Sequence, residues 1–172
     1  MSGRFYEKPS GITGHIFEEE LFGTVGPIEW DGRYIPYDKS LHMVIDNQPE
    51  GTDPTEPDKE PARDLHAQIA IALGLEDFSE LKFFTAVGSP LDRYHGVDAF
   101  IKFKGVVVTF DATLDKRKKE GTDGAKADFA LTEDDVNDKF VRVANEVAEY
   151  LKAVTKKGGK DEADASLLEV SA

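Results

Sequence analysis

The sequence predicts an α/β fold, in which a mixed sheet of about four core strands is flanked by helices and preceded by a β-rich N-terminal extension. Three observations support this prediction. Residues 81–131 contain four short runs of β-branched and aromatic residues, which are typical of strands. On either side, residues 61–73 and 132–157 carry apolar residues at helical spacing. Only Lys104-Gly105 separates the second run from the third, which predicts an antiparallel hairpin.

The composition limits the class of protein. A chain of 172 residues is the length of one domain, and 40% apolar residues suffice for a core. The lack of cysteine excludes disulfides and Cys-ligated zinc or iron–sulfur sites. No apolar run is long enough to span a membrane, and the N-terminus lacks the apolar segment of a secretory signal. We therefore expect a cytoplasmic protein without a membrane partner.

Residues 1–45 are predicted to form the β-rich extension. Asp31-Gly32 is a strong two-residue turn signal between two short apolar runs, and predicts a hairpin. Residues 41–45 are expected to form another short strand. The acidic, proline-rich residues 46–60 are predicted to be a linker.

Residues 61–157 are predicted to form the α/β core. Its first helix begins near Pro61, because proline suits the first helical position, and Gly74 ends it. The four strands are expected at residues 81–87, 97–103, 106–114 and 126–131.

A long helix is predicted to follow the last strand. Thr132 caps its N-terminus, and apolar residues from Val136 to Val154 form one stripe at helical spacing. Gly158-Gly159 is expected to end this helix, which leaves residues 158–172 as an acidic tail.

The predicted hairpin places two carboxylates together. A two-residue turn at Lys104-Gly105 sets Asp98 opposite Asp111, with Cβ atoms roughly 4.5–5.5 Å apart. Like charges at this distance repel, but a divalent cation would reverse the sign of the interaction. Mg²⁺ and Mn²⁺ prefer carboxylate and carbonyl oxygens, so Asp98, Asp111 and the carbonyl of Ala112 are candidate metal ligands. The alternative is that both aspartates lie at strand ends and are hydrated.

At these residues the chain resembles the restriction-endonuclease-like, PD-(D/E)XK, nuclease superfamily. The resemblance rests on Gly96-Val97-Asp98, the hairpin and Asp111-Ala112-Thr113, and covers about residues 61–131. It implies an α-β-β-β-α-β core, with Asp98 as the metal-binding aspartate and Asp111 at the first position of the (D/E)-x-K tripeptide. Thr113 stands where the family has lysine.

The resemblance implies that another lysine replaces the one missing at Thr113. Lys102, Lys116 and Lys126 are the candidates, and the sequence does not single one out. Members of the family often have an acidic residue on the first helix, for which Asp64 and Gln68 are candidates.

The net charge of −13 disfavours a long-range attraction to nucleic acid, although residues 99–127 have seven basic residues against four acidic ones. A run of four basic residues follows the third strand and is predicted to hold the DNA backbone; the alternative is a solvated loop. The run consists of Lys116, Arg117, Lys118 and Lys119.

The sequence thus predicts a nuclease that uses Mg²⁺ or Mn²⁺ to hydrolyse phosphodiester bonds in DNA. The first alternative is a catalytically inactive module that uses the nuclease fold to bind protein or nucleic acid. A second is an acidic protein that attracts a basic protein partner through its charge. Assembly as a homodimer also remains open.

Overall fold

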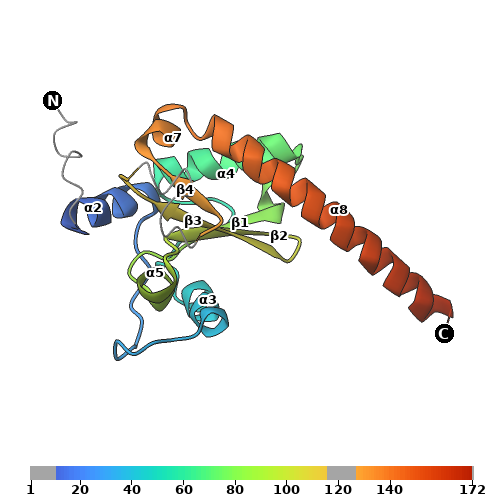
Figure 1. Ribbon diagram of the computed structural model, residues 1–172, viewed down its shortest axis with the longest axis horizontal. Helices are drawn as coiled ribbons and strands as arrows, with labels where there is room; N and C mark the ends of the chain where they lie inside the picture. Colours follow the sequence, from blue (N-terminus) through green and yellow to red (C-terminus); the bar gives the residue numbers. More distant parts are fainter. Residues whose placement is uncertain (1–10, 116–126, 172) are drawn as a thin grey trace.

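The computed structural model of the protein describes residues 11–115 and 127–171, in which four strands form one sheet (Figure 1). The strands, in their order across the sheet, are β1 (Leu81–Thr85), β2 (Ala99–Phe103), β3 (Val106–Ala112) and β4 (Phe129–Leu131). β2 is antiparallel to both β1 and β3, whereas β4 is parallel to β3. The predicted α/β fold with a mixed sheet is therefore confirmed, and each strand lies within its predicted range.

The hairpin between β2 and β3 has the predicted two-residue turn. Lys104 and Gly105 both have positive φ angles, 50° and 80°, as the tightest hairpin turns require. Ala99 pairs with Phe110 and Phe103 with Val106, which confirms the register expected from this turn. The start of β2, next to Asp98, therefore lies beside the end of β3.

Helices cover both faces of the sheet (Figure 1). They are α2 (Gly11–Phe22), α3 (Tyr37–Asp46), α4 (Glu60–Leu73), α5 (Pro90–His95), α7 (Glu133–Asn137), α8 (Val141–Ser171) and the 3-10 helix η1 (Phe78–Glu80). α4 and α8 pack together on one face, where Leu65 and Val147 share a buried cluster with Phe110. On the other face, α3 and α5 bury Val44 and Leu91 against Phe100. α2 lies at the end of the sheet where β3 ends.

Residues 11–45 contain the helix α2 and most of α3, so the β-rich extension predicted there is wrong; residues 1–10 lie outside the described part of the chain. Residues 23–36 contain no strand, and residues 41–45 belong to α3, which buries Val44. The Asp31-Gly32 turn signal is satisfied locally, because the Asp31 carboxylate accepts a hydrogen bond of 3.0 Å from the N–H of Arg33. The turn at Asp31-Gly32 therefore forms although no β-strand precedes or follows it within residues 23–36.

The predicted long C-terminal helix is divided in two. Thr132 caps α7 as expected, in a capping box with Asp135, but Lys139 and Phe140 then take left-handed φ angles of 56° and 64°. The break buries the Phe140 ring in the core. α8 continues through Gly158-Gly159 to Ser171, so the predicted helix end is wrong. Glycine costs about 1 kcal/mol in a helix, which neighbouring helix-forming residues can offset.

The left-handed conformation of Lys139 predicts a stabilising substitution. Lys139→Gly should raise the free energy of unfolding by about 1 kcal/mol, because glycine adopts positive φ without steric cost. The matched control is Lys152→Gly, at an exposed position inside α8, which should lower it by about 1 kcal/mol. Urea denaturation measures both changes, and equal destabilisation by the two substitutions would contradict this account of the break.

The acidic segment before α4 covers the free edge of the sheet. The N–H of Phe83 in β1 donates to the carbonyl of Pro54 at 2.8 Å. The Gln48 side chain accepts from the N–H of Thr85 at 3.1 Å and donates to its carbonyl at 2.8 Å. The segment thus protects an edge strand that could otherwise pair with another chain. Within the described residues, no helix has both the length and the apolar character needed to cross a bilayer.

Candidate functional site

Asp98 is a buried acidic residue at the start of the central hairpin. It follows α5, which ends at Gly96 with a φ of 67°, and its own N–H donates to the carbonyl of Phe110 at 2.8 Å. The side chain is only 1% exposed. One carboxyl oxygen, Oδ2, accepts a 2.9 Å hydrogen bond from the N–H of Ala112 in β3. The backbone of β3 thus holds the carboxyl group in place.

Asp111 meets Asp98 through its side chain. It lies in β3, is 8% exposed, and its carboxyl group is close enough to that of Asp98 to affect its titration. Two ionised carboxylates in contact repel each other, which favours the neutral form of one of them. The pKa of Asp98 is raised well above its usual value, mainly by burial. The negative charges of Asp92 and Glu18, and the contact with Asp111, raise it further.

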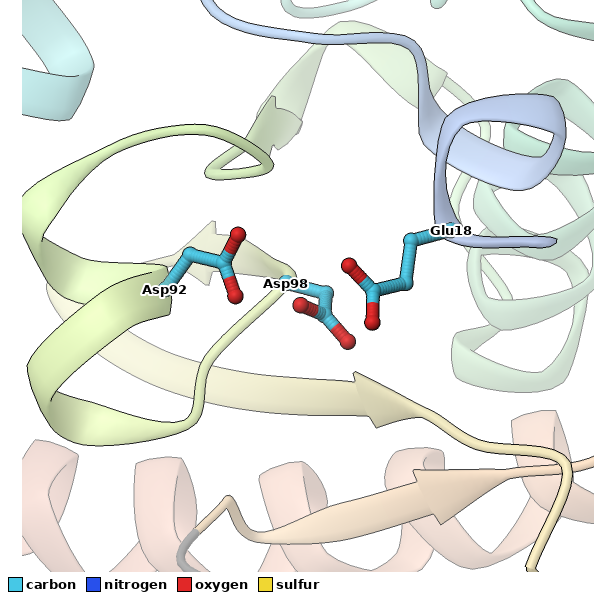
Figure 2. A group of neighbouring side chains, drawn as sticks. All are labelled: Glu18, Asp92 and Asp98. Atoms are coloured by element: carbon cyan, nitrogen blue, oxygen red, sulfur yellow. The ribbon is translucent and has the colours of Figure 1, made fainter. Parts of the chain in front are cut away.

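Two helices bring further carboxylates to Asp98. Glu18 comes from α2 and Asp92 from α5, and one oxygen of each lies within 4.8 Å of the others and of an Asp98 oxygen. Figure 2 shows their carboxyl groups on either side of Asp98. Asp92 is oriented by the N–H of Gly88, which donates to its Oδ2 at 2.9 Å. With Asp111, these residues form what we call the acidic cluster.

Sequence reasoning missed two members of the acidic cluster. Glu18 has apolar residues three and four positions further on, Leu21 and Phe22, so it borders the buried face of α2. Asp92 lies in α5, because Ser89-Pro90 begins a short helix, with the Ser89 hydroxyl accepting from two N–H groups. A serine cap followed by proline is a helix-start signal that could have identified α5.

The other residues predicted for the site lie elsewhere. Asp64 and Gln68 are in α4, which packs against α8 and α2, and Asp64 is not one of the carboxylates grouped with Asp98. Lys102 is exposed and lies four residues after Asp98, roughly 13 Å along β2 at the usual rise per residue. The structure therefore does not bring Lys102 to the carboxylates.

The remaining predicted basic residues fall outside the described part of the chain. They are Lys116, Arg117, Lys118, Lys119 and Lys126. Thr113, in the lysine position of the tripeptide, is buried and held by its neighbours. Its N–H donates to the carbonyl of Leu131 at 2.8 Å, and its hydroxyl accepts from the N–H of Asp115 at 3.0 Å.

The acidic cluster has the donor set of a hard divalent cation. Carboxylate oxygens are the protein ligands that Mg²⁺ and Mn²⁺ prefer, and a bound cation would remove the repulsion between these acidic groups. A buried carboxylate without such compensation is costly and tends to keep its proton. The raised pKa of Asp98 fits this condition.

Comparison of the chain with protein-family models, with curated proteins and with solved structures found no match.

Proposed function

We propose that the protein is a divalent-metal-dependent nuclease that hydrolyses phosphodiester bonds in DNA, as a divergent relative of the restriction-endonuclease-like superfamily. The observation that carries this proposal is the buried carboxyl of Asp98, in contact with Asp111 and flanked by two further carboxylates. Asp98 and Asp111 are also among the residues on which the resemblance to the superfamily rests.

The residues of the site fit a Mg²⁺ or Mn²⁺ ion. Asp98, Asp111 and the carbonyl of Ala112 would hold it, and Glu18 supplies the acidic residue that the superfamily often has on a helix. Glu18 takes this role in place of Asp64 and Gln68. A bound ion supplies an activated water and stabilises the charge that develops on the attacked phosphate.

The chain itself must perform two further tasks. Asp98 has to be ionised, because a protonated carboxyl is a poor ligand. A cationic group must also lie near the phosphate, and Thr113 has no charge to offer. Lys116 and Lys126 remain as candidates, and the basic run 116–119 would hold the DNA backbone.

A cleavage assay tests the proposal directly. Purified protein should cleave DNA in the presence of Mn²⁺ or Mg²⁺, and excess EDTA should stop the reaction. Single-stranded and duplex DNA and RNA are all offered, since the acidic cluster by itself does not select among them. Failure to cleave any of them with either ion would contradict the proposal.

Lysine substitutions identify the missing cationic group. Either Lys116→Ala or Lys126→Ala should lower the cleavage rate by at least about a hundredfold, the scale for losing one electrostatic catalytic group. The other should mainly weaken DNA binding, in a salt-dependent way. Lys102→Ala is the matched control, because Lys102 lies far from the carboxylates. A large rate loss in Lys102→Ala alone would contradict this assignment.

A second candidate function is a catalytically inactive module that binds protein or nucleic acid. Thr113 in the lysine position and the net charge of −13 favour it. A basic protein partner would then be held in a salt-sensitive complex. This function becomes the better one if the acidic cluster binds metal but the protein cleaves no nucleic acid.

A further inference from the structure

Five aromatic residues from three segments form a second surface, which we call the aromatic cluster. Its members are Trp30, Tyr34, Tyr37, Tyr94 and His95. The rings of Trp30 and Tyr34 lie edge-on to Tyr94, with centroids 5.9 and 5.4 Å away. Tyr34 and Tyr37 each lie 5.6 Å from the ring of His95. The aromatic rings between Trp30 and Tyr37 therefore pack against Tyr94 and His95 at the end of α5.

These rings are held in place, although part of the aromatic cluster is open to solvent. The Trp30 indole N–H donates to the carbonyl of Arg33 at 2.9 Å, and the Tyr94 hydroxyl donates to the carbonyl of Gly32. His95 Nε2 is 2.8 Å from the carbonyl of Ile35. Nevertheless, the side chain of Tyr34 is 62% exposed. Because the Tyr34 ring already contacts the rings of Tyr94 and His95, its side chain has little conformational entropy to lose when a ligand binds.

Tyr37 shares this exposure, at 40%, and two arginines border the aromatic cluster. The guanidinium of Arg93 lies 5.7 Å from the centroid of the Tyr94 ring. Arg33 is exposed beside Tyr34 and pairs with Asp31 at 3.2 Å. Exposed aromatic rings next to guanidinium groups match a nucleotide, whose base presents a flat π face and whose phosphate is an anion.

One short helix connects the aromatic cluster to the acidic cluster. α5 directs Asp92 towards Asp98 and, two and three residues later, carries Tyr94 and His95. Side chains two residues apart on a helix point to nearly opposite sides, so Asp92 and Tyr94 lie on different sides of α5.

We propose that the aromatic cluster binds an unpaired nucleobase of single-stranded nucleic acid, which stacks on Tyr34. Bases inside a duplex already stack on their neighbours and cannot offer a free face, so the ligand is a single strand or an unpaired nucleotide. The proposal deepens the proposed function, on which it rests, because it defines the substrate as one that contains unpaired nucleotides.

The single tryptophan of the chain, Trp30, reports on this surface. Its fluorescence is followed at low salt and in EDTA, where no cleavage takes place, during titration with short poly-dT, poly-rU and a DNA duplex of the same length. We expect both single strands to change the fluorescence and the duplex to have little effect. The single strand that binds with the lower Kd shows whether the surface prefers deoxyribose or ribose.

Variants at Tyr34 test the stacking itself. Tyr34→Ala should weaken single-strand binding by roughly tenfold to a hundredfold, the range for losing one base–aromatic stack. Tyr34→Phe keeps the ring and should retain the native affinity, whereas Tyr34→Leu keeps apolar area without a π face and should not. Tyr150→Ala, at an exposed tyrosine of α8, is the matched control and should bind as the native protein does. Because Tyr34 is exposed, these variants are expected to fold.

Three results would overturn the proposal: no binding of any single strand, native affinity in Tyr34→Ala, or equally tight binding of the duplex. Each is distinguishable from failure of the nuclease proposal, because binding is measured without metal. Tyr34-dependent binding without cleavage would retain the aromatic cluster as a single-strand binding surface and reject the enzyme. If the native protein cleaves nucleic acid but Tyr34→Ala binds single strands with native affinity, the enzyme is retained and the aromatic cluster is rejected as the binding surface.

Discussion

The Asp98→Asn variant should lose DNA cleavage and yet be more stable than the native protein at neutral pH without divalent cations. Cleavage should fall by at least about a hundredfold, because the variant lacks a charged ligand at the centre of the acidic cluster. Stability should rise because the amide is neutral and removes a buried like charge next to Asp111, while its oxygen can still accept from the N–H of Ala112.

The pH dependence of this stability difference follows from the raised pKa of Asp98. The folded protein binds the Asp98 proton more tightly than the unfolded chain does. The stability that this proton contributes is complete below the usual aspartate pKa of about 3.9, and is lost as the pH rises through the raised value. The advantage of Asp98→Asn should therefore be absent near pH 4 and largest at pH 7–8. We expect about 1–3 kcal/mol there, the scale of an uncompensated buried polar group.

Urea denaturation at several pH values, in EDTA, measures this difference. Asp64→Asn is the matched control, since Asp64 is an acidic residue that is not part of the acidic cluster, and should change neither cleavage nor stability appreciably. Destabilisation by Asp98→Asn at neutral pH would show that a cationic group stabilises the native carboxylate, and would contradict the prediction.

Mg²⁺ or Mn²⁺ should raise the melting temperature of the native protein. An ion that binds only the folded state at a concentration 100 times its Kd adds about 2.7 kcal/mol. For a chain of 172 residues this corresponds to roughly 5–10 °C. The increase should be larger at pH 8 than at pH 6, because metal binding competes with protonation of the Asp98 carboxyl group. Burial raises the pKa of this group.

Two glutamates of α2 provide the matched pair for this experiment. Glu18→Gln removes a member of the acidic cluster and should reduce the increase in melting temperature, whereas Glu20→Gln, at an exposed position of the same helix, should leave it unchanged. Isothermal titration in buffers of different ionisation enthalpy measures the released proton. An equal increase in Asp98→Asn would mean that the cations bind elsewhere on this acidic chain.

The central hairpin shows what short-range information determines. The Lys104-Gly105 turn leaves one register for β2 and β3, because a slip of one residue would move the apolar side chains to the wrong face. The same register brings Asp98 and Asp111 into one neighbourhood. Pro61 and Gly74 likewise mark the ends of α4 within one residue, since their backbone preferences act locally.

Elements that depend on distant contacts were not predictable in this way. Asp31-Gly32 has the strongest hairpin signal of the N-terminal region, but its neighbours pack against the rings of α5 and form no strands. The break between α7 and α8 occurs because Phe140 is buried in a core formed by other elements. In both places, contacts between segments far apart in the sequence outweigh the local preference.

By itself, the sequence determined the mixed sheet, the register of its hairpin and the two aspartates that this register brings near each other. Only the tertiary structure decided that Glu18, 80 residues before Asp98, and Asp92 on a short helix complete the acidic cluster. The same holds for Tyr34, which the folded chain places edge-on against the ring of Tyr94. The physical reason is that hydrogen bonding and turn geometry act over a few residues, whereas the position of a helix against a sheet is set by the apolar surface it buries.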